Sequence, residues 1–562
     1  MKRYWKHAVG LGLLIVAGVF LFNQLPVWSQ TREFQSFLTR HEAAVKKLCK
    51  EQNLAYVKAT ISGKDEDYRK ASDLSLKLTR IYANREDFQR IKAWKESGLI
   101  RDPLLKRQLD ILYLSYLGNQ IDEKKLEEMI DLQTRIEQNF NTYRVDLKGQ
   151  KLTDNEVREI LKTSTDNREL EQVWKASKMI GEVVAPDLIK LVRMRNQAAQ
   201  ELGFDNFHQM DLTLSEQDPE EIEEFFDELD ELTRDAFARD KREMDEVLAR
   251  RYRIKPESLM PWHYQDPFFQ EAPRLSEVDL DQLYADQDPV DLTRRYYASL
   301  GMPVDDIIAH SDLYEKPGKY QHAYCIDIDQ EGDIRVVANI RPNALGMDTM
   351  LHEYGHAVYF KYIDHELPWL LRNPAHTFTT EAVAMMFGNL ESNPDWIGKM
   401  LGTPAEETAR IGRECERYSV MNTLVFSRWV QVMYRFEKAM YENPDQDLNK
   451  LWWDLVEKYQ LLRRPPGRDQ ADWAAKIHLT SSPAYYHNYL LGNLLASQLE
   501  HYIASEVLRE PDTSMVGRTE VGEYLKQKVI APGQRYPWNE MIEKATGEKL
   551  TAKYFAEKYA KP

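Results

Sequence analysis

Residues 347 to 389 read MDTMLHEYGHAVYFKYIDHELPWLLRNPAHTFTTEAVAMMFGN and contain the motif His352-Glu353-Tyr354-Gly355-His356. Asp348 offers an N-cap, apolar residues recur at helical spacing after it, and no proline intervenes before Pro368. The pattern therefore predicts a helix. Residues four apart on a helix share one face, so the two imidazoles are expected to converge on one metal ion.

This motif has the residue types of a hydrolytic metal site. Zinc held by three protein ligands lowers the pKa of a bound water to about 7, and a nearby carboxylate accepts that water's proton during attack on a carbonyl. Glu353 is placed for this role, so we predict metal-assisted hydrolysis of an amide bond. The same spacing also arises from composition alone, and a third ligand decides between the two interpretations.

Glu381 is the candidate third ligand. It lies 25 residues after His356 and opens a second apolar segment, with Thr379 or Thr380 as a possible N-cap. A glutamate at this position also complements a helix dipole without binding anything. Because it follows two histidines at helical spacing, we predict that His352, His356 and Glu381 bind one Zn²⁺ per chain, although such ligands accept other divalent ions.

Composition limits the classes of function. The chain has 562 residues, 43% hydrophobic and 30% charged, which is typical of a folded globular protein and excludes wholesale disorder. A net charge of −16 argues against nucleic-acid binding through a general basic surface. Three widely spaced cysteines provide no disulfide framework and no CxxC metal knuckle.

The N-terminus has the pattern of an export signal, because basic residues precede the apolar run Ala8 to Phe22. This run is shorter than the roughly 20 residues of a membrane-spanning helix, which favours cleavage before Gln30 over a retained anchor. We therefore expect residues 1–29 to be a signal peptide or membrane anchor, residues 30–562 to form one domain, and the body to be periplasmic or extracellular.

Amphipathic helical patterns fill most of the remaining chain. The exception is a predicted hairpin, with strands over residues 321–328 and 334–340 joined by a turn at 329–333. The exposed edge of such a hairpin can pair with an extended peptide, and His322 lies at that edge. We predict a mostly α fold with a small hairpin beside the metal helix.

Polar residues gather again between Lys476 and Tyr489. Amide hydrolysis needs donors that stabilise the oxyanion developing on the attacked carbonyl, and histidine and tyrosine are competent donors. His478 and Tyr489 are the candidates, with Tyr486 one turn earlier. A tyrosine run on an apolar helix is equally typical of a core.

With these segments in place, the chain resembles the angiotensin-converting-enzyme family of zinc peptidyl-dipeptidases, in order across most of its length. The resemblance implies that Glu353 is the general base and that Lys476 holds the substrate's C-terminal carboxylate. It also implies that His478 contacts the scissile carbonyl, that Tyr486 helps to bind the carboxylate and that Tyr489 stabilises the oxyanion.

Two weaker correspondences complete the resemblance. His322 and Ala323 are similar to the family's strand that binds substrate backbone, and Gln265 is similar to its carboxylate-binding glutamine. The implied fold is a helical ellipsoid whose two lobes enclose a deep cleft with zinc at its floor. Asn488 stands where the animal enzymes have a chloride-binding arginine, so chloride activation is not implied.

The leading hypothesis is an exported zinc metallopeptidase that releases C-terminal dipeptides from oligopeptides. The alternative is an oligoendopeptidase, because the spacing from Pro483-x-Tyr485 to Gly492 resembles the thimet-oligopeptidase family. A non-catalytic peptide-binding protein on the same scaffold is the third possibility. We expect a monomer that binds oligopeptides and no nucleic acid, with membrane association possible through the N-terminal segment.

Overall fold

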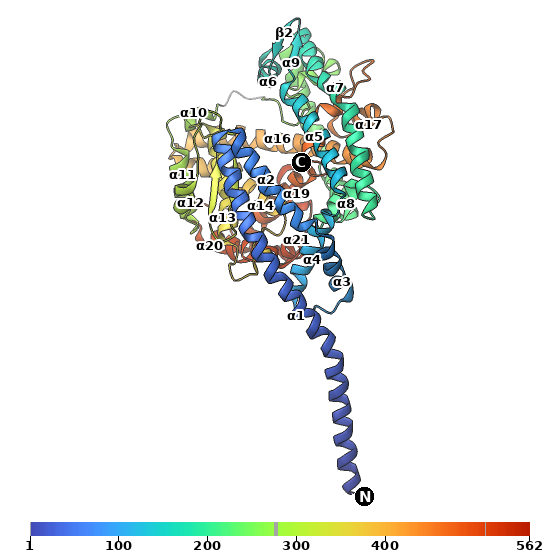
Figure 1. Cartoon of the computed structure of the whole chain (residues 1–562). Helices are drawn as coiled ribbons and strands as arrows, with labels where there is room; N and C mark the ends of the chain where they lie inside the picture. The colour runs from blue at the N-terminus through green and yellow to red at the C-terminus, as the bar shows by residue number, and fades with distance from the viewer. Residues whose placement is uncertain (1, 275–278, 512, 562) are drawn as a thin grey trace.

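The computed structural model describes residues 2–274, 279–511 and 513–561, with side chains from residue 27 onward except that of Asn141. The chain is mostly helical, as predicted (Figure 1). The helices of the first half are α1 Lys2–Ser62, α2 Asp65–Tyr82, α3 Arg85–Ser97, α4 Pro103–Gly118, α5 Glu123–Thr142, α6 Asp154–Thr163, α7 Asn167–Glu201, α8 Phe207–Leu214, α9 Pro219–Tyr252, α10 Asp281–Tyr284, α11 Pro289–Ser299 and α12 Asp305–His310.

The second half begins with the helices that carry the predicted metal ligands. Its helices are α13 Ala344–Tyr362, α14 Thr377–Gly388, α15 Pro394–Leu401, α16 Ala405–Glu442, α17 Leu448–Leu455, α18 His478–Ser481, α19 His487–Tyr502, α20 Thr519–Tyr524, α21 Trp538–Thr546 and α22 Lys553–Tyr559. Single π-helical turns continue α17, α19 and α20 over Val456–Gln460, Ile503–Leu508 and Leu525–Ile530.

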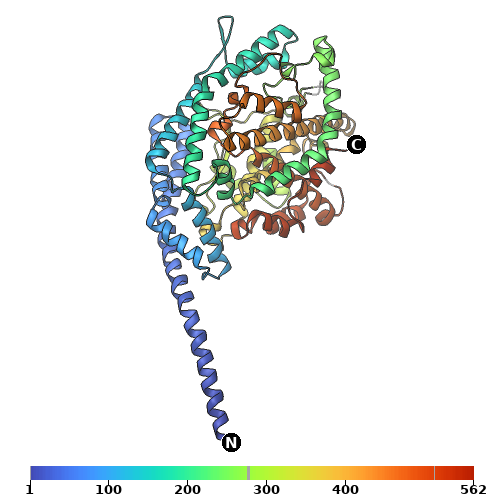
Figure 2. The same cartoon turned by 90° about the vertical axis from the view of Figure 1, so that its right-hand side faces the viewer.

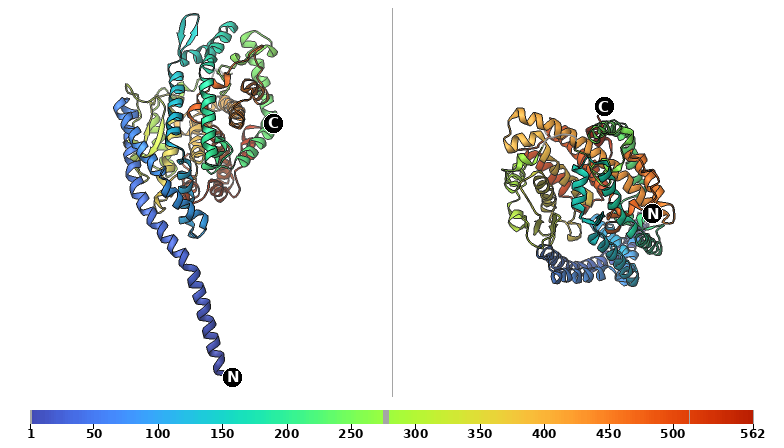
Figure 3. Two further views of the ribbon diagram at one scale, coloured as in Figure 1. Left: turned by 45° about the vertical axis from the view of Figure 1, so that its right-hand side comes forward. Right: turned by 90° about the horizontal axis from the view of Figure 1, so that it is seen from above.

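The N-terminal helices form a layer along one side of the body. Helices α1 and α2 lie side by side, and the first part of α1 projects away from the rest of the chain (Figures 2 and 3). Within the part of the chain that the structure describes, no helix is long and apolar enough to cross a membrane. The predicted export segment, residues 1–29, lies almost entirely outside the described side chains.

One large hydrophobic core organises the body. Its buried residues run from Met129 in α5 to Tyr559 in α22, and it includes Leu351, Val358 and Phe387 from the two helices of the predicted metal site. A smaller core joins α1, α3 and α4 to Trp369. The two helices of the predicted metal site therefore pack into the large core.

Two short antiparallel hairpins accompany the helices. Strands β3 Tyr324–Asp327 and β4 Ile334–Val337 pair with Tyr324 opposite Val337, which confirms the predicted hairpin with shorter strands. Both strands contact α13. The other hairpin, β1 Val145–Leu147 with β2 Gln150–Leu152, was not expected, because three-residue strands are too short to show an alternating pattern.

The predicted caps of both ligand helices were wrong. Helix α13 begins one turn earlier than expected, since Asn343 is extended and its side chain accepts a hydrogen bond from the Gly346 amide. Asp348 therefore lies inside the helix. Helix α14 is capped by His376, with the Thr379 hydroxyl completing a capping box, so Thr379 and Thr380 both lie inside the first turn.

Candidate active site

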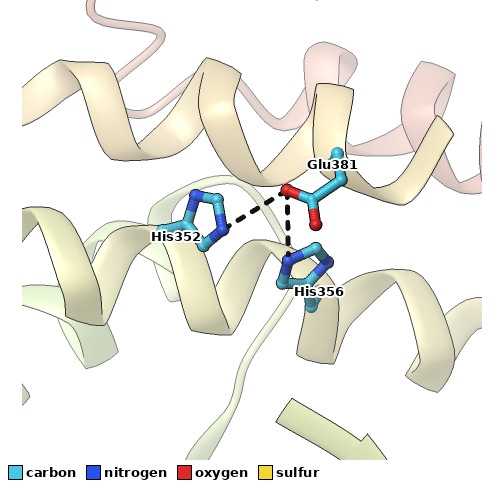
Figure 4. Close-up of side chains that lie close together, drawn as sticks. All are labelled: His352, His356 and Glu381. Atoms are coloured by element: carbon cyan, nitrogen blue, oxygen red, sulfur yellow. Dashed lines mark ion pairs between the residues drawn. The ribbon is translucent and has the colours of Figure 1, made fainter. Parts of the chain in front are cut away.

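The three predicted metal ligands converge. His352 and His356 project from α13 toward Glu381 on the facing helix α14 (Figure 4). The Nε2 atoms of the two histidines lie 3.7 and 3.9 Å from Glu381 Oε2. Among the described residues, this is the one group of three or more histidine, cysteine or carboxylate side chains whose ligand atoms lie within 4.8 Å of one another.

Close helix packing brings these ligands together. A Cβ placed on Gly355 would lie 2.7 Å from the Cα of Ala384, so the glycine of the motif permits α13 to approach α14. On the other side of α14, a Cβ on Gly492 would lie 3.3 Å from the Cβ of Glu381. Helix α14 is therefore held between α13 and α19, and Glu381 has little freedom to move away from the histidines.

The donor set fits zinc. Two imidazoles and one carboxylate with an open position are the ligands of catalytic zinc sites, which have metal–ligand distances of about 2.0–2.2 Å. Burial lowers the pKa of His352 to about 4 and that of His356 to about 3. Both imidazoles are thus neutral at pH 7 and have a lone pair to offer a metal ion.

Glu353 is buried beside the ligands and is 8% exposed. Burial, together with the nearby carboxylates of Glu381 and Asp348, raises the pKa of Glu353 to about 8. A carboxyl group that titrates near neutrality is suited to taking up and releasing a proton.

Tyr489 lies on the first turn of α19 and is partly buried. Burial, and secondarily the charge of Glu381, raise its pKa, and α19 packs on the helix that carries Glu381. Tyr485 has the same relation to Glu381, and its ring centroid lies 5.4 Å from that of Tyr489. Sequence reasoning missed Tyr485 as a site residue, because it lies before the start of α19, where helical spacing gives no guide.

Lys476 is a buried cation in an aromatic enclosure. It is 8% exposed, and its ammonium lies 5.2–5.5 Å from the ring centroids of Phe268, Trp429 and Tyr486. Its Nζ donates a hydrogen bond of 2.6 Å to the amide oxygen of Gln270. Burial lowers its pKa to about 8, and no described carboxylate forms an ion pair with it. Such a buried cation is a natural partner for a ligand carboxylate.

Tyr486, which forms part of the Lys476 enclosure, lies beside both His478 and Tyr489. The Tyr486 ring centroid is 5.1 Å from His478 and 5.4 Å from Tyr489, and its hydroxyl accepts a 2.8 Å hydrogen bond from Trp429. Burial lowers the pKa of His478 to about 4, so the ring is neutral. Its Nδ1 is buried without a hydrogen-bond partner, which leaves this atom available to a bound molecule.

Gln265 forms no hydrogen bond with Lys476 among the described residues, and its role in binding a carboxylate stays a prediction. Its backbone is left-handed, with φ of 63°, and its side-chain oxygen accepts a hydrogen bond from the Arg274 amide. Gln270 occupies the position beside Lys476 instead. The sequence contains this second glutamine five residues later, but the spacing along the chain does not reveal which of the two turns toward a residue 206 positions away.

His322 and Ala323 immediately precede β3, which contacts α13. His322 is exposed, and its ring centroid lies 5.3 Å from that of Tyr320. Their role in binding substrate backbone stays a prediction.

Similarity to a known protein family extends over nearly the whole chain. The peptidase family M2, described as angiotensin-converting enzyme, matches residues 28–562. The angiotensin-converting enzyme-like protein Ace3 of Mus musculus is 24% identical over 449 residues, covering 72% of this chain and 59% of the relative. Angiotensin-converting enzyme of Sus scrofa is 23% identical over 443 residues, covering 72% of this chain and 33% of the relative. Thermostable carboxypeptidase 1 of Pyrococcus furiosus is 28% identical over 141 residues, covering 24% of this chain and 27% of the relative.

This chain therefore matches less than two thirds of the length of each of these relatives. The match to the family, in contrast, spans nearly the whole chain and includes every residue of the site described above. The chain belongs to the angiotensin-converting enzyme family of peptidases.

Proposed function

We propose that this chain is a zinc metallopeptidase that binds the free C-terminus of an oligopeptide and releases a dipeptide from it. The observation that carries the proposal is the buried Lys476 cation, which has no described carboxylate partner and lies beside the tyrosines that lead to the metal ligands. A zinc site accounts for hydrolysis, and the unpaired cation accounts for the choice of the C-terminal end.

His352, His356 and Glu381 would hold the zinc ion, which supplies a Lewis acid that polarises the scissile carbonyl and acidifies water. Glu353 accepts the proton of the attacking water and passes it to the leaving nitrogen. Its pKa of about 8 supports this role, because a base that takes up and then releases a proton must titrate near the working pH.

Two side chains would stabilise the oxyanion that develops on the substrate carbonyl. Tyr489 lies near Glu381 and has a raised pKa, so its hydroxyl keeps its proton and donates a hydrogen bond. His478 is neutral at pH 7 and carries one ring proton to donate. Such donors contribute when they point at the position that the oxyanion occupies in the transition state.

The enclosure around Lys476 binds the terminal carboxylate. One carboxylate oxygen accepts from the ammonium, and the side-chain amide of Gln270, whose oxygen already accepts from Lys476, has its own protons left to donate. Tyr486 adds a hydroxyl proton, because its oxygen accepts from Trp429 and its own hydrogen is free to turn toward the ligand. These donors select a peptide with a free C-terminus.

The test is digestion of a free-acid peptide and its C-terminal amide, followed by mass spectrometry, with the Glu353→Gln variant as control. The proposal expects stepwise loss of dipeptides from the free acid and little cleavage of the amide. Internal cleavage of both peptides at similar rates would refute the dipeptidase assignment.

An oligoendopeptidase is the second candidate. The specific observation in its favour is Tyr485, which lies near Glu381 beside Tyr489 and belongs to the spacing that resembles thimet oligopeptidases. The carboxypeptidase among the relatives favours action from the C-terminus instead. A non-catalytic peptide-binding protein would bind zinc and cleave neither peptide.

Export of the protein is also a proposal, and it rests on the basic and apolar pattern of residues 1–29. The monomer of residues 30–562 would act on oligopeptides outside the cytoplasm, in two lobes around a cleft, as its family resemblance implies. N-terminal sequencing of the purified protein distinguishes cleavage before Gln30 from a retained anchor. Gel filtration with light scattering tests the expected monomer.

A further inference from the structure

The second histidine of the metal motif has a hydrogen-bond partner on the opposite helix. His356 Nδ1 lies 2.8 Å from the hydroxyl oxygen of Thr380, which immediately precedes Glu381 on α14. The other ring nitrogen, Nε2, is the atom that faces Glu381 Oε2. The two nitrogens of this ring therefore have separate partners, a hydroxyl on one side and the ligand cluster on the other.

Metal binding through Nε2 would fix which nitrogen carries the proton. Nε2 must present a lone pair if it is to bind a metal ion, so the single proton of the neutral ring is on Nδ1. Nδ1 then donates to the Thr380 hydroxyl, which also holds the plane of the ring in the direction of Glu381.

The fold, and not the local sequence, creates this contact. His356 and Thr380 are 24 residues apart, and they meet because Gly355 lets α13 lie against Ala384 of α14. Thr380 is 7% exposed and the His356 side chain 13% exposed, so water competes little for the bond. Helix α14 thus supplies one ligand directly, Glu381, and orients a second ligand, His356, through Thr380.

We propose that Thr380 is a positioning residue for the metal, acting through His356 and not by touching metal or substrate. This inference rests on the proposed metal site. Partners of this kind set the tautomer and orientation of a ligating histidine, and their loss typically weakens metal binding 10- to 100-fold. An apolar residue of equal shape at position 380 would leave the buried Nδ1 proton unpaired and free the ring to adopt the wrong tautomer.

The experiment compares zinc affinity in Thr380→Val, Thr380→Ser and Thr379→Val, measured by competition with a chromophoric chelator at fixed pH. Valine keeps the shape of threonine without the hydroxyl, whereas serine keeps the hydroxyl. Thr379 is the neighbouring control, because it is buried and its hydroxyl contacts the His376 backbone and the Tyr359 hydroxyl instead of a metal ligand. Absorption spectra of the cobalt-loaded proteins report ligand geometry independently of activity.

We expect Thr380→Val to bind zinc about 10- to 100-fold more weakly and to change the cobalt spectrum. Thr380→Ser and Thr379→Val should bind zinc as the unmodified protein does. If Thr380→Val does not fold, Thr380→Ala removes the same hydroxyl and gives the same comparison. Unchanged affinity in the valine or alanine variant, or equal weakening in serine, would overturn the role of Thr380 and leave the metal site intact. Failure of the unmodified protein to bind zinc would overturn both this inference and the proposed function.

Discussion

Replacing Lys476 with methionine should separate substrate binding from stability. Burial lowers the pKa of this lysine from 10.5 to about 8. At about 1.4 kcal/mol per pKa unit, holding the ammonium in the folded protein near pH 7 costs about 3 kcal/mol. Methionine retains the apolar stem but leaves the Gln270 oxygen without its donor, a loss of about 1–3 kcal/mol. The free energy of unfolding should therefore be unchanged or rise by up to about 2 kcal/mol.

The activity of the same variant on free-acid peptides should fall, although its stability does not. Loss of one partner of a buried, hydrogen-bonded charge pair typically removes about 2–5 kcal/mol of binding. For a free-acid peptide, kcat/KM should thus fall by about 30-fold to several thousand-fold. A C-terminally amidated peptide lacks the charge that Lys476 recognises, so its slow cleavage should change little.

The assays are urea unfolding and cleavage of the matched free-acid and amide peptides. Lys458→Met is the control, because Lys458 is exposed and lies over the Tyr459 ring, where its charge is not buried. The folded protein loses the Lys476 proton above about pH 8 and the unfolded chain only above about pH 10.5. The unfolding free energy of the unmodified protein, relative to that of K476M, should therefore rise between these pH values. An unstable K476M that loses activity equally on both peptides would refute the reasoning, because Lys476 would then be structural.

Further substitutions test the remaining roles. Glu353→Gln should retain zinc, measured by metal analysis, yet lose about 10²–10⁴-fold in kcat, and an active variant would contradict its role as base. Tyr489→Phe should lower kcat on the order of a hundredfold with unchanged unfolding, because it removes one oxyanion donor; full activity would mean that another group donates. Burial raises the pKa of Glu437 from 4.5 to about 8, so the folded state keeps a proton that the unfolded chain releases and stability should fall as pH rises between these values. In Glu437→Gln the amide oxygen can still accept from the Ala484 amide. The variant should therefore lose less unfolding free energy than the unmodified protein between pH 5 and pH 8, as measured by urea unfolding. An equal loss in both proteins would argue against a buried, neutral Glu437.

Local spacing predicted the centre of the site. The interval between His352 and His356 places both on one helical face whatever surrounds them, because α-helix geometry is the same in every protein. Glu381 was predicted from its place at the start of an apolar segment after two proline turns. The exact helix starts were not predicted, since Asn343 and His376 cap these helices in preference to Asp348 and the threonines. Several side chains compete to cap a helix, and their tertiary contacts decide among them.

The sequence by itself determined the helical class, the hairpin before α13 and the residue types of a zinc peptidase, because periodicity and motif spacing are properties of neighbouring residues. Only the tertiary structure decided that Gln270 contacts Lys476, that the Tyr485 ring lies against that of Tyr489, and that Thr380 contacts His356. Such pairs depend on how closely buried helices approach one another. That distance is set by packing across the whole core, which cannot be predicted from a short stretch of sequence.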